Sequence, residues 1–173
     1  MRLLTVGHGA SSAEHLVDLL VAAGVEAVVD IRRFPGSRRN PHFGEHALAE
    51  SLSDAGLRYR WDARLGGRRR LPPGGAERDA WWRVEAFRAY AAHARTPEHA
   101  AARADLVRQA ATERTAIMCS EVLWWRCHRR LVADALVLVH GVDVAHLGHD
   151  GRVSGHVPAE GARISAEGLH YPG

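Results

Sequence analysis

Apolar runs and amphipathic stretches alternate along the chain from its first residues onward. Residues 2–6 form a short apolar run that predicts a strand, and residues 25–31 form a second run that is typical of a buried parallel strand. Between them, leucines recur at helical spacing up to Ala23, and Ser11 and Glu14 are spaced as a capping box with Ser11 as the cap. A strand, a helix and a strand within about thirty residues indicate a βαβ unit.

The same alternation continues to the end of the chain. The further predicted elements are a helix over residues 45–55, a strand over 57–61, helices over 81–94 and 98–111, a strand over 115–119, a helix from about 124 to 140, and a strand over 142–147. The tail from about residue 148 is rich in turn residues and is expected to be irregular. The pattern predicts one α/β domain over residues 1–173, with a Rossmann-like, mainly parallel sheet flanked by helices.

Composition narrows the class of protein. At 173 residues with 46% hydrophobic and 25% charged residues, the chain suits one globular domain and not a disordered segment. No apolar run reaches the roughly 18 residues that span a bilayer, so we expect no membrane association. The first residues do not have the pattern of a signal peptide, and two cysteines suit a reducing, cytoplasmic setting. A C2 dimer is the default expectation for the oligomeric state.

The basic residues are the unusual part of the composition. All 23 are arginines, and the formal net charge is only +3. A GC-rich genome accounts for such a bias by itself, although the planar guanidinium group also suits phosphate. The arginines gather in three clusters, which are Arg32, Arg33, Arg38 and Arg39, then Arg58, Arg60, Arg64, Arg68, Arg69 and Arg70, then Arg126, Arg129 and Arg130.

Polar and aromatic residues fall at or just beyond the end of each predicted strand. In chain order they are His8, then Asp30 and Arg32, then Tyr59 and Trp61, then Cys119 and Glu121, then His146. In open parallel sheets, ligands bind in the crevice beyond the carboxyl ends of the strands. We therefore expect one polar, Arg-rich site at this edge, although each residue alone also fits an ordinary structural role, such as an ion pair for Asp30.

Two acids in a cationic crevice favour acid–base chemistry. We expect Asp30 and Glu121 to be the acid–base groups, with His8 or His128 assisting, and we expect alanine at either acid to leave folding largely intact. Tyr59 and Trp61 are candidate surfaces on which a base could stack. Candidate anion-binding residues in the loop after the second strand are Arg32, Ser37, Arg38 and Arg39.

The stretch IMCSEVLWWRCHRR holds both cysteines and is consistent with several sites. Structural zinc sites commonly pair cysteines as C-x2–4-C, whereas the spacing here is C-x7-C, so we predict no metal site. Cys127, in the first turn of the predicted helix, is a candidate catalytic thiol, although a packing role fits equally well. The helix start suits an anion held with Cys119, His128 and Arg129, and Trp124 and Trp125 are candidate stacking residues.

Several of these motifs together resemble an uncharacterised bacterial family, the domain of unknown function 488. The resemblance rests on TVGHG at Thr5, VVDIRRFPGSRRNPHF at Val28, LGGRR at Leu65, FRAYAAHA at Phe87, IMCSEVLWWRCHRRLVAD at Ile117, VAHL at Val144, and the closing GLHYPG. It implies a Rossmann-like single domain and supplies no activity. Its recurring polar residues match His8, Asp30, Arg32, Ser37, Arg38, Cys119, Glu121, Cys127, His128 and Arg129, while Gly9 stands where the family usually has Ser.

Three classes of function follow from these observations. The first is an enzyme or binding protein for DNA, RNA or a nucleotide, which could hydrolyse a phosphoester or an N-glycosidic bond. The second is a protein that binds a small anion or a metal and uses Cys119, Cys127 and His128 in thiol or redox chemistry. The third is a non-catalytic adaptor domain. The sequence indicates no particular cofactor, and it leaves open whether the protein is an enzyme.

Overall fold

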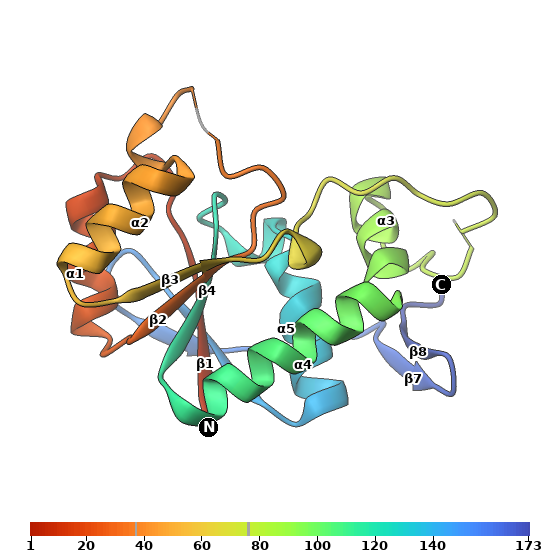
Figure 1. Ribbon diagram of the computed structural model, residues 1–173. Helices are drawn as coiled ribbons and strands as arrows, with labels where there is room; N and C mark the ends of the chain where they lie inside the picture. The colour runs from red at the N-terminus through yellow and green to blue at the C-terminus, as the bar shows by residue number, and fades with distance from the viewer. Residues whose placement is uncertain (37, 76) are drawn as a thin grey trace.

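Six strands form one sheet at the centre of the molecule. The computed structural model describes residues 1–36, 38–75 and 77–173, so the predicted site residue Ser37 lies outside the described residues. The strands are β1 (Arg2–Gly7), β2 (Ala27–Asp30), β3 (Arg58–Trp61), β4 (Thr115–Cys119), β5 (Asp143–Leu147) and β6 (Val153–Gly155). Their order across the sheet is β3-β2-β4-β1-β5-β6, and only β6 is antiparallel to its neighbour (Figure 1).

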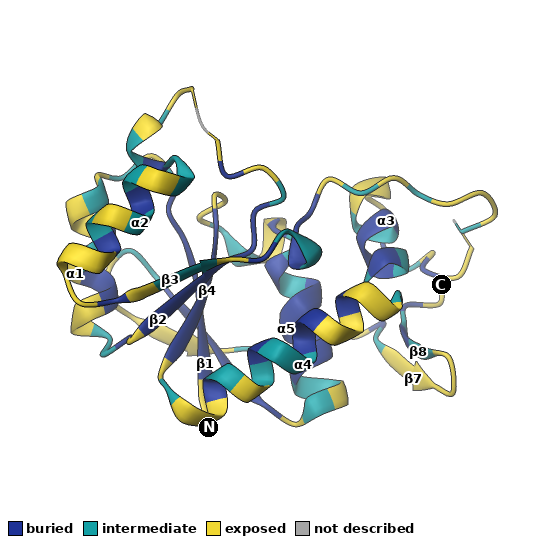
Figure 2. Cartoon of the chain, in the orientation of Figure 1, coloured by how far each residue is buried: buried dark blue, intermediate teal, exposed yellow. Residues whose placement is uncertain are grey.

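Helices cover both faces of this sheet, as the sequence pattern predicts. The helices α1 (Ala13–Ala22) and α2 (Glu45–Asp54) lie on one face, and α4 (Pro97–Thr112) and α5 (Arg129–His140) lie on the other, where α3 (Glu85–Ala94) packs against α5. Alternate residues of each strand point to opposite faces, so Leu3 packs with α4 and α5 whereas Leu4 packs with α1. The three central strands are almost wholly buried, as Figure 2 shows, which explains their continuous apolar runs.

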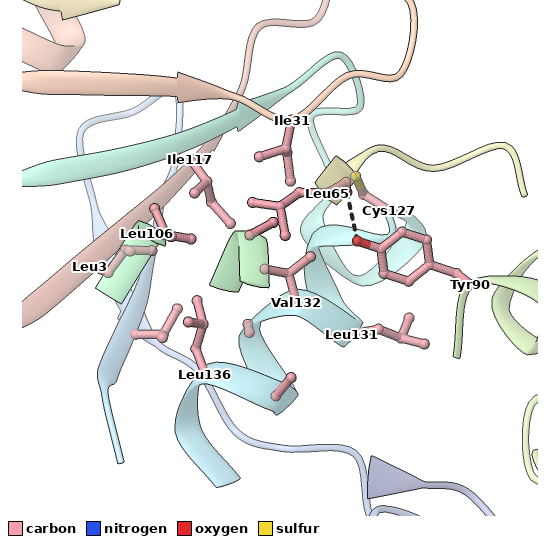
Figure 3. Packing of buried hydrophobic residues seen from close by; sticks show 14 of the residues in the cluster. Leu3, Ile31, Leu65, Tyr90, Leu106, Ile117, Cys127, Leu131, Val132 and Leu136 are labelled. Carbon is pink, nitrogen blue, oxygen red and sulfur yellow. Dashed lines mark hydrogen bonds between the residues drawn. The ribbon is translucent and has the colours of Figure 1, made fainter. Parts of the chain in front are cut away.

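The core on the α5 side reaches the ends of the strands. In Figure 3, three residues on the sheet side point toward Val132 and Leu136 of α5. They are Leu3 on β1, Ile31 just after β2, and Ile117 on β4. Cys127 and Tyr90 belong to the same cluster, and the Tyr90 hydroxyl donates a hydrogen bond of 2.6 Å to the carbonyl oxygen of Leu65. This core therefore supports residues that the sequence places near the site.

Three helix starts differ from the sequence prediction. Ser12, and not Ser11, caps α1, because its hydroxyl accepts a hydrogen bond of 3.1 Å from the backbone N–H of His15. The α3 helix begins at Glu85 and not at residue 81. A separate 3-10 turn occupies Trp124–Arg126, and the extended backbone of Cys127 (φ −116°, ψ 150°) delays the start of α5 to Arg129. Cys127 therefore precedes the helix instead of lying in its first turn.

The segment after β5, expected to be irregular, contains three short strands. They are β6, which pairs with β5, and the hairpin of β7 (Arg163–Ser165) and β8 (Gly168–His170). The buried carboxylate of Asp134 on α5 holds this segment, because it accepts hydrogen bonds from His156 Nε2 (2.7 Å), the Ala159 backbone N–H (3.1 Å) and the Tyr171 hydroxyl (2.8 Å). None of the helices in the described ranges is long and apolar enough to cross a membrane.

Replacing Asp134 with Ala should destabilise the fold strongly. Three buried donors would lose their acceptor, and we expect the free energy of unfolding to fall by about 3 kcal/mol or more, measured by urea denaturation. Asp143→Ala is the control, because the pair between Asp143 and Arg2 is exposed and should contribute less than about 1 kcal/mol. Equal losses in the two variants would contradict an anchoring role for Asp134.

Candidate functional site

A cleft of about 650 Å³ lies at the carboxyl ends of the central strands. Its walls come from the loops after β1, β2, β3 and β4 and from α3. The chain leaves β1 and β2 toward the α1 and α2 face, whereas it leaves β4, which lies between them, toward α5. Such a reversal opens a crevice between neighbouring strands, and this is where open α/β sheets bind ligands.

Gly7 lets two of these loops approach each other closely. A Cβ atom on Gly7 would lie 1.8 Å from the carbonyl oxygen of Glu121, so no other residue fits between the ends of β1 and β4. Gly9 has a φ of +58°, and a Cβ there would lie 2.5 Å from a methyl carbon of Val122. The turn after β1 therefore also favours a residue without a side chain.

Asp30 and Arg32 form a buried ion pair beneath the cleft. Asp30 is 0% exposed, and its two carboxylate oxygens lie 2.9 and 2.5 Å from the Nε and Nη2 atoms of Arg32. The Tyr59 hydroxyl donates to the same carboxylate at 2.8 Å, and burial together with the Asp30 charge raises the pKa of Tyr59 above its ordinary value. Arg32 also donates to the carbonyl oxygen of Phe43 at 2.8 Å, so it ties the loop after β2 to the sheet.

His8 is a neutral ring at the edge of this network. Its Nδ1 lies 2.8 Å from the carbonyl oxygen of Gly9, which can only accept, and its Nε2 lies 3.3 Å from Nη1 of Arg32, which can only donate. The proton is therefore on Nδ1. Burial, helped by the Arg32 charge, lowers the pKa of His8 to about 4, and its ring stacks on Phe43 with centroids 4.1 Å apart.

Both cysteines meet His128 on the floor of the cleft. The Nδ1 atom of His128 lies 3.9 Å from Sγ of Cys119 and 3.6 Å from Sγ of Cys127. Burial raises the pKa of Cys127, but the hydrogen bond from Cys119 and the Arg129 charge outweigh it and lower the pKa to about 6. The same hydrogen bond, together with burial, raises the pKa of Cys119 to about 12. Of the two thiols, Cys127 is therefore the one that ionises more readily, and Cys119 is the one that keeps its proton to donate.

Arg129 is one cause of the lowered pKa of Cys127. The Arg129 side chain is 1% exposed, and its Nε and backbone N–H donate to Sγ of Cys127 at 3.4 and 3.5 Å. Its Nη2 donates to the carbonyl oxygens of Glu121 and Val122. No carboxylate among the described residues lies within ion-pair distance of Arg129, so the sulfur is its only anionic partner.

The sequence pattern of one known family covers most of this chain. The family described as "Domain of unknown function DUF488" matches residues 12–136, which include the ends of β2 and β4 and the start of α5. The chain belongs to the DUF488 family. It matches no curated protein and no solved structure.

The DUF488 cleft contains only part of the set that the sequence predicts. The predicted residues that line it are His8, Arg32, Arg39, Cys119, Glu121, Cys127 and His128. Asp30 lies beneath it, and Arg129 is buried behind Cys127. Arg38 is exposed but does not line the cleft.

The four predicted stacking residues do not line the DUF488 cleft. Tyr59 is held by Asp30, and Trp61 donates to the carbonyl oxygen of Arg32 at 2.8 Å. Trp124 stacks on His146, with ring centroids 4.0 Å apart and planes at 6°, so both belong to the packing under the C-terminal segment. Trp125 is exposed and lies against Trp124 in an edge contact.

Other residues of the cleft were not selected from the sequence. They are Phe34, Gly67, Phe87, Tyr90 and Ser120, among others, whereas Arg33, Arg68 and Arg126 were named as members of the arginine clusters. The Gly- and Arg-rich composition of the loop after β3 is a signal that could have identified Gly67. Phe87 and Tyr90 have no such signal, because they follow the ordinary apolar spacing of a helix.

A second hollow of about 710 Å³ lies at the opposite ends of the strands. It is lined by Arg2, Leu4 and Glu26 among others, and by no cysteine or histidine of the described residues. The Glu26 carboxylate accepts a hydrogen bond of 2.7 Å from the backbone N–H of Arg114. The hollow therefore offers packing between loops and no convergent chemistry, whereas the cleft of the DUF488 domain offers several reactive groups.

Asp30→Ala should destabilise the protein, which reverses the expectation from the sequence. The variant would leave the guanidinium group of Arg32, 6% exposed, without its anion. We expect the free energy of unfolding to fall by about 3–5 kcal/mol in chemical denaturation. Glu121→Ala is the matched control, because Glu121 is exposed, and it should change stability by no more than about 0.5 kcal/mol. Wild-type stability of the Asp30 variant would show that the buried pair has no structural role.

Acid should destabilise the fold before carboxylates titrate. Burial is the main cause that lowers the pKa of three histidines, to about 2 for His99, about 3 for His146 and about 4 for His8. A neighbouring side chain lowers each pKa further, and these neighbours are Arg103, His156 and Arg32 respectively. From the ordinary value of 6.5 downward, the unfolded chain binds protons that the folded chain does not. The free energy of unfolding should be highest above pH 6.5 and decrease steadily from pH 6.5 to pH 5. Urea titrations at several pH values, with ring proton NMR of His8, would test this, and a flat profile would contradict it.

Proposed function

We propose that this protein binds a phosphate-bearing ligand, either a nucleotide or the end of a nucleic-acid strand, in the cleft. The observation that supports the proposal is a set of uncompensated cations. Arg39, Arg68 and Arg126 line the cleft, are exposed, and form no ion pair with any described residue. Arg33 adds a fourth guanidinium group, whose Nη1 donates to the carbonyl oxygen of Arg68 at 2.5 Å.

The opposing charge in the cleft is small. Glu121 is the only carboxylate among the described residues that line it, and Arg32 is neutralised by Asp30. Four guanidinium groups facing one carboxylate give a positive crevice, which concentrates anions. Arginine forms two parallel hydrogen bonds with a phosphate, so phosphate is the anion that this rim suits best.

The cleft also offers apolar surface for a base. Phe34 is 61% exposed at one wall, and Phe87 lies on α3 at another. Base–aromatic stacking contributes about 1–3 kcal/mol per base, without dependence on sequence. These residues replace Tyr59, Trp61, Trp124 and Trp125 in the stacking role, because the latter four do not line the cleft. A volume of about 650 Å³ is of the size that encloses a small organic ligand.

Arg68 has a backbone conformation that supports a functional role for its loop. Its φ is +56°, and it is the only non-glycine residue in the described ranges with a positive φ. Such a conformation is unfavourable for a side chain with a Cβ atom and is retained where the surroundings require it. It follows Gly66 and Gly67, whose lack of side chains lets the loop pack against Arg33 and His128.

Hydrolysis of a phosphoester or N-glycosidic bond of that ligand would require an acid–base group. Glu121 is the candidate, because Asp30 is engaged by Arg32 and Tyr59 and has no exposed surface. The Glu121 Oε1 atom accepts a hydrogen bond of 3.1 Å from the backbone N–H of Leu123, which orients the carboxylate. The proposal therefore assigns binding to the arginines and acid–base chemistry to Glu121.

Ligand binding should depend on Arg126 and on salt. With three phosphate contacts, affinity for labelled single-stranded DNA or RNA should fall by about 20-fold between 50 and 200 mM salt. Arg126→Ala should weaken binding of AMP, ADP or the strand by about tenfold or more, measured by calorimetry or fluorescence anisotropy. The Arg163→Ala variant is the matched control, since Arg163 is exposed on β7 and does not line the cleft.

Two results would contradict the proposed function. One is the absence of any nucleotide or nucleic-acid binding at 50 mM salt. The other is an equal loss in the Arg126 and Arg163 variants, because a diffuse effect of net charge would then account for all of the binding.

A further inference from the structure

Two sulfur atoms and one ring nitrogen, all of which can bind a metal, lie close together on the floor of the cleft. They are Sγ of Cys119 at the end of β4, Sγ of Cys127 before α5, and Nδ1 of His128, and all lie within 4.8 Å of one another. Nδ1 is 3.6 Å from the Cys127 sulfur and 3.9 Å from the Cys119 sulfur. A tetrahedral ion with bonds of about 2.3 Å to sulfur and about 2.0 Å to nitrogen separates those atoms by about 3.5 Å.

The ring of His128 is oriented as a metal ligand. Its Nε2 lies 3.2 Å from the carbonyl oxygen of Ile31, which can only accept, so Nε2 carries the ring proton. The lone pair of the neutral ring is therefore on Nδ1, which faces the two sulfurs. Histidines that bind metals usually donate their second N–H to a carbonyl or a carboxylate in this way.

The charges around the sulfurs also suit a cation. Arg129 donates to the Cys127 sulfur from its Nε and its backbone N–H, as donors around metal-bound thiolates do. Nδ1 of His128 and the Cys127 sulfur lie 3.6 Å apart, which leaves room for an ion bonded to both. A divalent ion in that position would bind both sulfurs as thiolates.

We propose that Cys119, Cys127 and His128 bind a zinc-class divalent cation whose fourth coordination position opens into the cleft. Two sulfurs and one imidazole select a borderline-soft ion over magnesium or calcium. All three residues line the cleft, so a water molecule or a ligand oxygen can reach the ion from that side. Three protein ligands with one open position are the composition of catalytic zinc sites, whereas structural sites are closed by a fourth protein ligand.

Gly67 leaves the space beside the histidine nitrogen free. A Cβ atom on Gly67 would lie 2.9 Å from Nδ1 of His128, where the proposed ion is bound. The loop after β3 can therefore pass directly over the site only because this residue has no side chain. Only the ligand at the fourth position rests on the proposed function, since the three protein ligands bind the ion by themselves.

Metal content and the cobalt spectrum test the site directly. The intact protein, stripped with a chelator under reducing conditions, is incubated with Zn²⁺ or Co²⁺ and desalted. We expect about one equivalent of metal per chain, with a thiolate-to-cobalt charge-transfer band and the intense visible bands of tetrahedral cobalt. Less than about a tenth of an equivalent, or a cobalt spectrum without the thiolate band, would overturn the proposal and leave a cluster held by hydrogen bonds alone.

Variants separate the three ligands from other residues. Cys119→Ser, Cys127→Ser and His128→Gln should each weaken metal binding by about 100-fold or more, since even loss of an outer-shell partner costs about 10–100-fold. His46→Gln is the control, because His46 is exposed on α2. Gly67→Ala keeps all three ligands and should still weaken binding. If the cysteine variants fail to fold by circular dichroism, the His128 and Gly67 variants decide, and wild-type affinity in both would overturn the site.

Inorganic phosphate and AMP test the open position. Either should shift the visible bands of the cobalt protein if an anionic oxygen replaces water on the ion. An unchanged spectrum in a protein that binds both cobalt and AMP would overturn the open position. Cobalt binding without any AMP binding would contradict the proposed function and leave the metal site intact. AMP binding by a protein that binds no metal would contradict the metal site and leave the proposed function intact.

Discussion

Two buried guanidinium groups, Arg32 and Arg129, determine how the loops at the ends of the central strands are held. A charge that is removed from water needs an anion within the fold, and each of these residues has a different one. Arg32 has the carboxylate of Asp30, and Arg129 has the sulfur of Cys127. Arg32 also binds the carbonyl oxygen of Phe43 after β2, and Arg129 binds carbonyl oxygens after β4. The two compensated charges thus fix both walls of the cleft, and the exposed arginines remain available for a ligand.

The strands and helices could be predicted from the sequence because their signals are local. The spacing of apolar residues predicts all five parallel strands and the helices between them, with shifts of a few residues at their ends. The sequence predicts where the site lies but not which residue has which role in it, and Asp30 illustrates the physical reason. The sequence around an acidic residue after a strand is the same whether its carboxylate faces a ligand or a buried arginine. For Asp30 the difference comes from Tyr59 on the neighbouring strand, which binds the carboxylate and helps to bury it. The parallel case is Trp124, whose stacking partner, His146, comes from a strand more than twenty residues away.

The three residues of the Cys–His cluster were selected from the sequence, but their spacing predicted no metal site, for a different reason. Spacing rules for zinc assume cysteines that are close in sequence on one turn, and here seven residues separate Cys119 from Cys127. The turn at Trp124–Arg126 and the extended backbone at Cys127 bring the second sulfur back toward the end of β4. The sequence pattern predicts a continuous helix from residue 124. In such a helix Cys127 and His128 would point away from the face that carries the arginines. The local break in the helix is therefore what creates the cluster.

The proposed binding of a metal and of a phosphate would be coupled by the charge on the floor of the cleft. Without a metal, Arg129 is engaged by the sulfur of Cys127, so the floor offers little to an anion that the rim attracts. A divalent ion between two thiolates is neutral, and Arg129 then gives the floor a net positive charge. An anionic oxygen at the open position would cancel that charge beside two largely buried sulfurs, where charges interact more strongly than in bulk water. The arginine rim would then select the class of ligand and the occupied metal site would hold its charged end, so local charge and not the overall net charge of +3 would determine phosphate binding.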